Sequence, residues 1–137
     1  MLKRLLFGLF VSLLLVGCSA KSVQTVEEEK PPVIENNAYY LVSFGKTRMA
    51  VPKKAKILLR EGQYAGNAGC NGMSGKYDLD GDKIKFHSGI STMMACEDMS
   101  GETRFRKLLD TVDNWSVRDD TMILKDGDKE ILIFQKR

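Results

Sequence analysis

Apolar and polar residues alternate over short stretches from about residue 38 onward, and this alternation predicts β-strands separated by tight turns. The predicted strands are residues 39–44, 56–60, 63–66, 75–79, 83–87, 115–118, 122–125 and 130–135. Glycine and acidic residues occupy the connections at Glu61-Gly62, 80–82 and 126–128, which favours consecutive antiparallel hairpins.

One stretch has the helical period instead. Ser100 is the expected N-cap, with Glu102 in the first turn. The apolar stripe at i, i+3, i+4 and i+7 consists of Phe105, Leu108, Leu109 and Val112. The sequence therefore predicts a mainly β domain (α+β): a curled antiparallel sheet or open β-barrel of about eight strands, with one helix packed over an opening.

The first 17 residues have the pattern of a bacterial lipoprotein signal peptide. Lys3 and Arg4 precede an apolar run over residues 5–16, and residues 15–18 read Leu-Val-Gly-Cys, which matches the lipobox. A largely apolar run of twelve residues falls short of the roughly 20 that cross a membrane, so an uncleaved anchor with an incidental cysteine is disfavoured. We expect Cys18 to be lipidated, and several acyl chains such as palmitate suffice for stable anchoring.

Residues 18–37 carry Ser, Thr, Lys, Glu and two prolines without an apolar period, which predicts a lipidated flexible tether. About 19 residues of coil reach roughly 25 Å. Ser19 stands where an aspartate would retain a lipoprotein in the inner membrane. We therefore expect an outer-membrane lipoprotein that faces the periplasm, with its domain over residues 38–137.

The charge of the mature chain argues against nucleic-acid binding. Of 21 basic residues, Lys3 and Arg4 lie in the signal, so 19 remain against 18 acidic ones. A protein that coats nucleic acid shows a basic excess on its folded domain. The short basic cluster at residues 53–56 is interpreted as a solvated strand edge. We expect a monomer.

The stretch over residues 66–75 contains four glycines and Cys70, and a second stretch, residues 91–96, contains Cys96. So many glycines are unusual inside a strand or helix, which predicts a loop whose backbone adopts positive φ or approaches another segment closely. Together with Gly75-Lys76-Tyr77 and residues 102–109, this pair of stretches resembles the META domain family, which includes the HslJ-type heat-inducible envelope lipoproteins. The resemblance implies a stress-associated envelope module that is not an enzyme.

With Cys18 assigned to lipid, Cys70 and Cys96 remain as a pair in an oxidising compartment, where one disulfide is the natural interpretation. Closing about 26 residues would stabilise the fold by roughly 3.5 kcal/mol. The alternative is two buried thiols that never meet.

Enzymatic and metal chemistry find little support. His87, the single histidine, ends a predicted strand and is expected at the surface or an edge, so a Cys–His nucleophile is disfavoured. One histidine and two distant cysteines make no zinc site. The acidic turns at 80–82 and 126–128 do not fit a calcium loop, and residues 66–75 lack the ending of a phosphate loop. We expect no catalytic residue, metal or cofactor.

Two features are candidates for binding. Met73, Met93, Met94 and Met99 cluster around the cysteines, and core filling is favoured over a partner surface. If the disulfide joins the loops, a polar patch is expected on Asn71, Ser91, Thr92 and Glu97. An alternative of equal weight is that these side chains only form hydrogen bonds with backbone groups of the loop.

Two function classes follow. The first is a lipid-tethered module that binds an envelope protein or another envelope component. The second is a carrier of a small hydrophobic ligand inside the barrel, in the manner of lipocalins.

The lipobox makes a direct prediction. Cys18→Ser should give a soluble or unprocessed precursor, because the acylated sulfur is absent. Mass spectrometry of the mature wild-type N-terminus should find the acyl chains. An unmodified N-terminus would refute the assignment.

Overall fold

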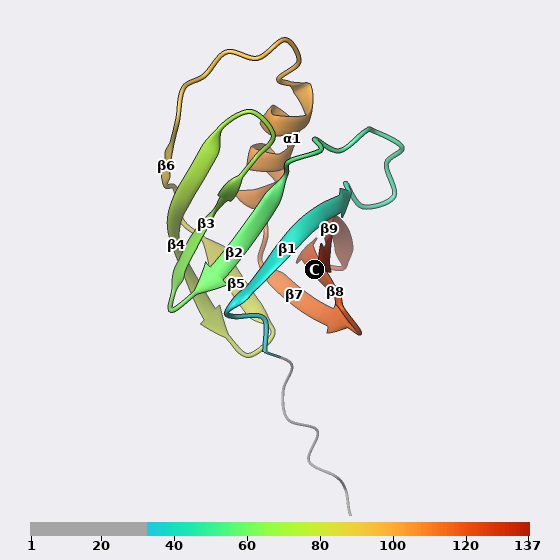
Figure 1. Ribbon diagram of the computed structural model, residues 1–137. Coiled ribbons are helices and arrows are strands. Elements are labelled where there is room, and N and C mark those ends of the chain that lie inside the picture. Colours follow the sequence, from blue (N-terminus) through green and yellow to red (C-terminus); the bar gives the residue numbers. More distant parts are fainter. Residues whose placement is uncertain (1–32) are drawn as a thin grey trace, which may run out of the picture. The chain divides into compact units, whose positions relative to one another are not determined.

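The computed structural model describes residues 33–137, which form an antiparallel sheet and one helix (Figure 1). The elements are β1 (Asn37–Ser43), β2 (Lys56–Arg60), β3 (Gln63–Asn67), β4 (Gly72–Asp80), β5 (Lys83–Phe86), β6 (Ile90–Ser91), α1 (Ser100–Leu109), β7 (Asn114–Arg118), β8 (Thr121–Asp126) and β9 (Lys129–Lys136). Eight strands correspond to predicted ones, and β2 has the predicted bounds. The additional strand, β6, has two residues. Cys18, the predicted signal peptide and the predicted tether up to residue 32 lie outside the described residues.

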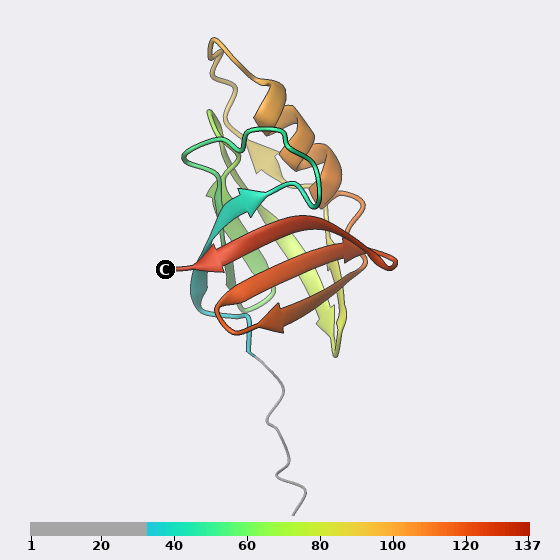
Figure 2. The ribbon, with the colours of Figure 1, turned by 90° about the vertical axis from the view of Figure 1, so that its right-hand side faces the viewer.

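The sheet closes on itself. Its order is β3-β2-β1-β9-β8-β7-β5-β4-β6, and β3 also pairs with β4 from Gln63↔Lys76 to Asn67↔Gly72. The pairing of β5 with β7 is short and has one register pair, Lys83↔Asn114. Figure 2 shows the resulting curl of the sheet. The predicted curled antiparallel barrel with one helix is confirmed.

The turn between β2 and β3 shows how sequence fixes this geometry. Glu61 and Gly62 both have positive φ, 49° and 74°. Two successive positive φ angles characterise the type I′ hairpin turn, whose twist matches that of the flanking strands. The hairpin predicted at this dipeptide is confirmed.

Inward-facing side chains fill the barrel. Burial alternates along β2, where Ile57 and Leu59 are fully buried, as the period of a strand requires. The fold begins earlier than predicted: Ile34 is 1% exposed, and the Asn36 N–H donates to the Leu59 carbonyl at 2.7 Å. Residues 34–37 were predicted as tether because two prolines precede this segment and it carries no apolar period, but they belong to the folded part.

Helix α1 lies at one end of the barrel, near the loop that joins β1 to β2 (Figure 2). Phe105 and Leu109 are buried, and the Phe105 ring lies 5.8 Å from that of Phe134 in β9. The predicted Ser100 cap is wrong. Met99 is the N-cap residue and makes no side-chain capping bond, while Asp98 Oδ1 accepts a hydrogen bond from the Ser100 N–H at 2.9 Å.

The glycine-rich stretch is only partly a loop. Residues 68–71 connect β3 to β4, whereas residues 72–74, which were predicted as loop, already lie in β4 together with Gly75. A Cβ atom at Gly75 would lie 2.6 Å from the Tyr64 ring, so the glycine is needed for close packing within the sheet. In the loop itself, Gly69 has φ 141°. Both predicted uses of glycine, positive φ and close approach, are therefore present.

Candidate functional site

We call residues 68–71 and residues 92–99 together the double loop. Residues 68–71 join β3 to β4, and residues 92–99 join β6 to α1. A disulfide between Cys70 and Cys96 connects its halves, with the Cα atoms 6.1 Å apart. Cys96 is exposed and Cys70 half-buried, so the bond lies at the surface. The predicted pairing is confirmed, and the alternative of two separate buried thiols is wrong.

Asn71 holds the two halves together from inside. Its side chain is 3% exposed. Its Oδ1 accepts from the Thr92 hydroxyl at 2.8 Å and from the Met94 N–H at 2.7 Å. Its Nδ2 donates to the Met94 carbonyl at 3.1 Å and to Glu102 Oε1 at 2.9 Å. All donor and acceptor capacity of this amide is thus used within the protein.

Glu102, in the first turn of α1, completes this network. Its Oε2 accepts from the backbone N–H groups of Cys70 at 2.8 Å and Asn71 at 2.7 Å. The side chain is 3% exposed, which is rare for a carboxylate and is compatible with folding only because its oxygens are bonded. One helix residue therefore fixes the β3–β4 loop.

The environment of Glu102 also sets its ionisation. Burial by itself would raise the pKa of the Glu102 carboxyl. Hydrogen bonds from Asn71 and Cys70, together with the charge of Arg106, favour the carboxylate and hold the pKa below its ordinary value. The carboxylate is therefore the form that stabilises the fold.

Sequence reasoning treated Glu102 only as a favourable first-turn acid. A signal was nevertheless present: Glu102, Phe105 and Leu109 lie at i, i+3 and i+7, on the same helix face. An acid within a core-facing stripe must find buried donors. The chain has such donors in the backbone of residues 70–71, but 31 positions separate Glu102 from Asn71, and only the fold brings them together.

The predicted polar patch divides into different roles. Asn71 is buried, and the exposed Thr92 both donates to Asn71 and accepts from the Gly72 N–H at 3.1 Å. Ser91 is half-buried and donates to the Thr92 carbonyl at 3.0 Å. Glu97 is exposed. Asn71 and Thr92 thus satisfy loop groups, as the alternative prediction had it.

The exposed surface of this region also carries large apolar side chains. Met93 is 98% exposed, Met94 58% and the neighbouring Ile90 78%. Core filling was predicted for the methionines, and it holds for Met73, which is 8% exposed, but is wrong for Met93 and Met94. The disulfide and Asn71 hold residues 94–96 at the surface, so the side chains beside them cannot reach the core.

Other chemistry-bearing residues do not gather here. His87 is exposed and lies 2.7 Å from the Asp78 carboxylate, at the other end of β4 from the double loop. Among residues 33–137 there is no group of three or more His, Cys, Asp or Glu side chains placed to hold a metal ion. Within the same residues, no helix has the length and apolar character needed to cross a membrane.

Comparison with known proteins gives a family match and structural neighbours. The META domain matches residues 32–137. No curated protein sequence matches the chain.

Three solved structures are similar in fold. A protein from Burkholderia xenovorans, solved by NMR, shares 24% identity with a TM-score of 0.59 over 76% of this chain and 83% of its own. A DUF4847 family protein from Bacteroides vulgatus ATCC 8482 shares 15% identity, with a TM-score of 0.56 over 75% and 94%. Another protein solved by NMR shares 17% identity, with a TM-score of 0.60 over 77% and 93%. At these identities the likeness concerns the fold alone.

The Glu102 network predicts a pH-dependent stability. The folded-state pKa of Glu102 is lowered. The stabilisation by Glu102 is therefore fully present above pH about 4.5, the ordinary pKa of the group, and is lost as the pH falls through the lower folded-state pKa. Glu102→Gln should lose about 1–3 kcal/mol at neutral pH, since an amide cannot accept all three bonds. Urea unfolding at several pH values should show that the difference in the free energy of unfolding between variant and wild type becomes smaller in acid.

Glu97→Gln is the matched control, since Glu97 is exposed on the same double loop. Its stability should stay within about 0.5 kcal/mol of wild type at neutral pH. An equal loss in both variants, or a gap that does not change with pH, would contradict the assigned role of Glu102.

The disulfide makes a second prediction. Cys70→Ser and Cys96→Ser should each lose about 2–5 kcal/mol, and the double variant little more, because either change opens the same loop. Thermal unfolding with and without reductant measures this. Reductant should lower the wild-type midpoint and leave that of the double variant unchanged.

Proposed function

Because the chain belongs to the META domain family, we propose that it is a lipid-anchored module of the bacterial envelope that binds a protein partner through the apolar surface of the double loop. The proposal places the anchor at Cys18 and the domain on the periplasmic side of the outer membrane. The module acts as a monomer, without catalysis or cofactor, in the response to envelope stress.

The exposed apolar side chains Ile90, Met93 and Met94 carry this proposal. Single apolar residues on a surface are ordinary, but three within five residues, two on the double loop and one on the adjacent strand β6, are a mark of an interaction site. Methionine is also enriched in protein interfaces, where its flexible thioether adapts to the partner.

Rigidity supports the same conclusion. Residues 92–99 are held by the disulfide, by Asn71 and, through Asn71, by Glu102. A loop that is already ordered loses little conformational entropy when it binds. The stabilising network therefore favours binding by the side chains it leaves exposed.

The negative charge near Met93 and Met94 favours a protein over a lipid surface as the binding partner. Glu97 and Asp98 are exposed on the double loop. Anionic lipids would repel these carboxylates, whereas a partner with an apolar centre and basic rim would complement them.

The alternative of a lipocalin-like carrier has less support. Inward-facing side chains such as Ile57, Leu59 and Phe134 are 0% exposed and occupy the barrel interior. A cavity of about 380 Å³ lined by Phe44, Arg104 and Leu108 among others lies beside the helix and opens to solvent, not inside the barrel.

Photocrosslinking in cells tests the proposal. A photoreactive amino acid at position 93 should give a protein adduct, whereas the same group at Lys85, exposed on β5, should not. Met93→Ser combined with Met94→Ser should weaken binding by about tenfold or more and leave stability within about 0.5 kcal/mol.

Leu79→Ser is the matched control, since Leu79 is 39% exposed on β4 away from the double loop. Equal adducts at positions 85 and 93 would refute the surface. Adducts with lipid alone at position 93 would replace the protein partner by the membrane.

A further inference from the structure

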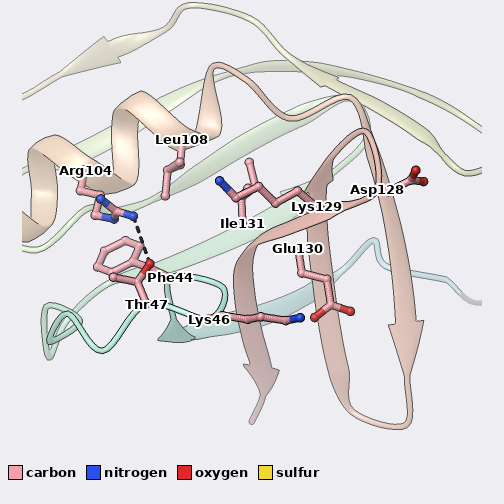
Figure 3. Close-up of a pocket in the computed structure, with 9 residues that line it drawn as sticks. All are labelled: Phe44, Lys46, Thr47, Arg104, Leu108, Asp128, Lys129, Glu130 and Ile131. Carbon is pink, nitrogen blue, oxygen red and sulfur yellow. Dashed lines mark hydrogen bonds between the residues drawn. The ribbon is translucent and has the colours of Figure 1, made fainter.

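A cleft of about 380 Å³ lies between α1, the start of the β1–β2 loop and the β8–β9 hairpin (Figure 3). Its apolar lining comes from Phe44, Leu108 and Ile131. No residue of the double loop lines it, so this cleft is separate from the surface described above.

Arg104 is the most constrained cation in the cleft. Its guanidinium carbon lies 5.6 Å from the centre of the Phe44 ring, and its Nη2 donates to Thr47 Oγ1 at 3.3 Å. Among residues 33–137 it has no salt bridge, and its buried Nε has no hydrogen-bond partner. A guanidinium has five N–H donors, so most of this capacity is unused.

A second cation reaches the same space. Figure 3 shows the Lys129 ammonium extending toward Leu108 and Arg104. The Lys46 ammonium and the Glu130 carboxylate point toward one another at the other side, and the Asp128 carboxylate points away. Arg104 and Lys129 therefore face the cleft without an acidic side chain between them.

We propose that this cleft binds a small organic carboxylate with a compact apolar body. The carboxylate would lie between Arg104 and Lys129, and the apolar body against Phe44, Leu108 and Ile131. Pockets of this size suit small ligands, and a few polar groups over an apolar lining fix their orientation.

The charges favour a carboxylate over a phosphate. Arg104, Lys129 and Lys46 are offset by Asp128 and Glu130, so the lining has an excess of one positive charge. A monoanion neutralises this excess, whereas a dianionic phosphate would leave an uncompensated negative charge in the cleft. The planar guanidinium also matches the two oxygens of a carboxylate.

Two sources supply this chemistry: a free organic acid and the C-terminal residue of a polypeptide. Both present a carboxylate next to an apolar group. The test therefore uses the free acid isocaproate, the peptide acetyl-Ala-Ala-Leu with a free C-terminus, and the same peptide as its C-terminal amide.

Binding to the full-length protein in neutral detergent is measured by calorimetry and by NMR amide shifts. We expect at least one acid to bind with an affinity of about 1 mM or tighter and to shift the signals of Thr47, Leu108 and Lys129. Affinity should fall with added salt. Binding of isocaproate alone assigns a free acid, and binding of the peptide acid alone assigns a C-terminus.

Lys129→Met tests the site without endangering the fold, because Lys129 is exposed. It should weaken binding two- to fivefold, roughly the range for an exposed ion pair. Lys107→Met, also exposed but outside the cleft, should leave binding unchanged. Arg104→Lys keeps the charge but loses the planar guanidinium that binds both carboxylate oxygens, and should weaken binding about tenfold.

Three results would overturn the proposal. The first is no binding by either acid at roughly 10 mM. The second is equal binding by the peptide amide, which lacks the anion. The third is shifts confined to residues away from the cleft, or equal effects of Lys129→Met and Lys107→Met.

Discussion

The carboxylate of Glu102 is the acceptor on which the organisation of this domain depends. It receives two backbone N–H groups of the β3–β4 loop and the side-chain amide of Asn71, in bonds that are buried at Asn71 and partly buried at Cys70. Buried donors without an acceptor cost about 1–3 kcal/mol each. The first turn of α1, the start of β4 and residues 92–94 can therefore keep their positions together only while this carboxylate is in place.

The disulfide acts on the same region by a different mechanism. The bond between Cys70 and Cys96 restricts the unfolded chain, whereas Glu102 and Asn71 determine which folded arrangement the closed loop takes. A disulfide alone would allow many conformations of residues 92–99. The hydrogen bonds of Asn71 select one of them, and in that one Met93 lies at the surface.

The sequence predicts the barrel well because the barrel follows from local rules. Strand alternation and turns such as Glu61-Gly62 depend on neighbouring residues, and β2 has the predicted bounds. The strand β6 was missed because two residues carry no periodicity, and it forms only through pairing with β4. The burial of Asn71 and Glu102 and the exposure of Met93 were missed for a related reason: each depends on contacts between segments distant in sequence.

One side of α1 is buried against the barrel and the double loop, and another side lines the cleft. Glu102, Phe105 and Leu109 share the buried face, while Arg104 and Leu108, four positions apart, share the side next to the cleft. Because the Glu102 network fixes the rotation and depth of α1, it also fixes where Arg104 projects. A cation held in this way against Phe44 needs little reordering to meet an anion, which is the condition for useful affinity in a small cleft. The buried carboxylate thus sets the geometry of both the exposed apolar loop and the cationic cleft, although it belongs to neither surface.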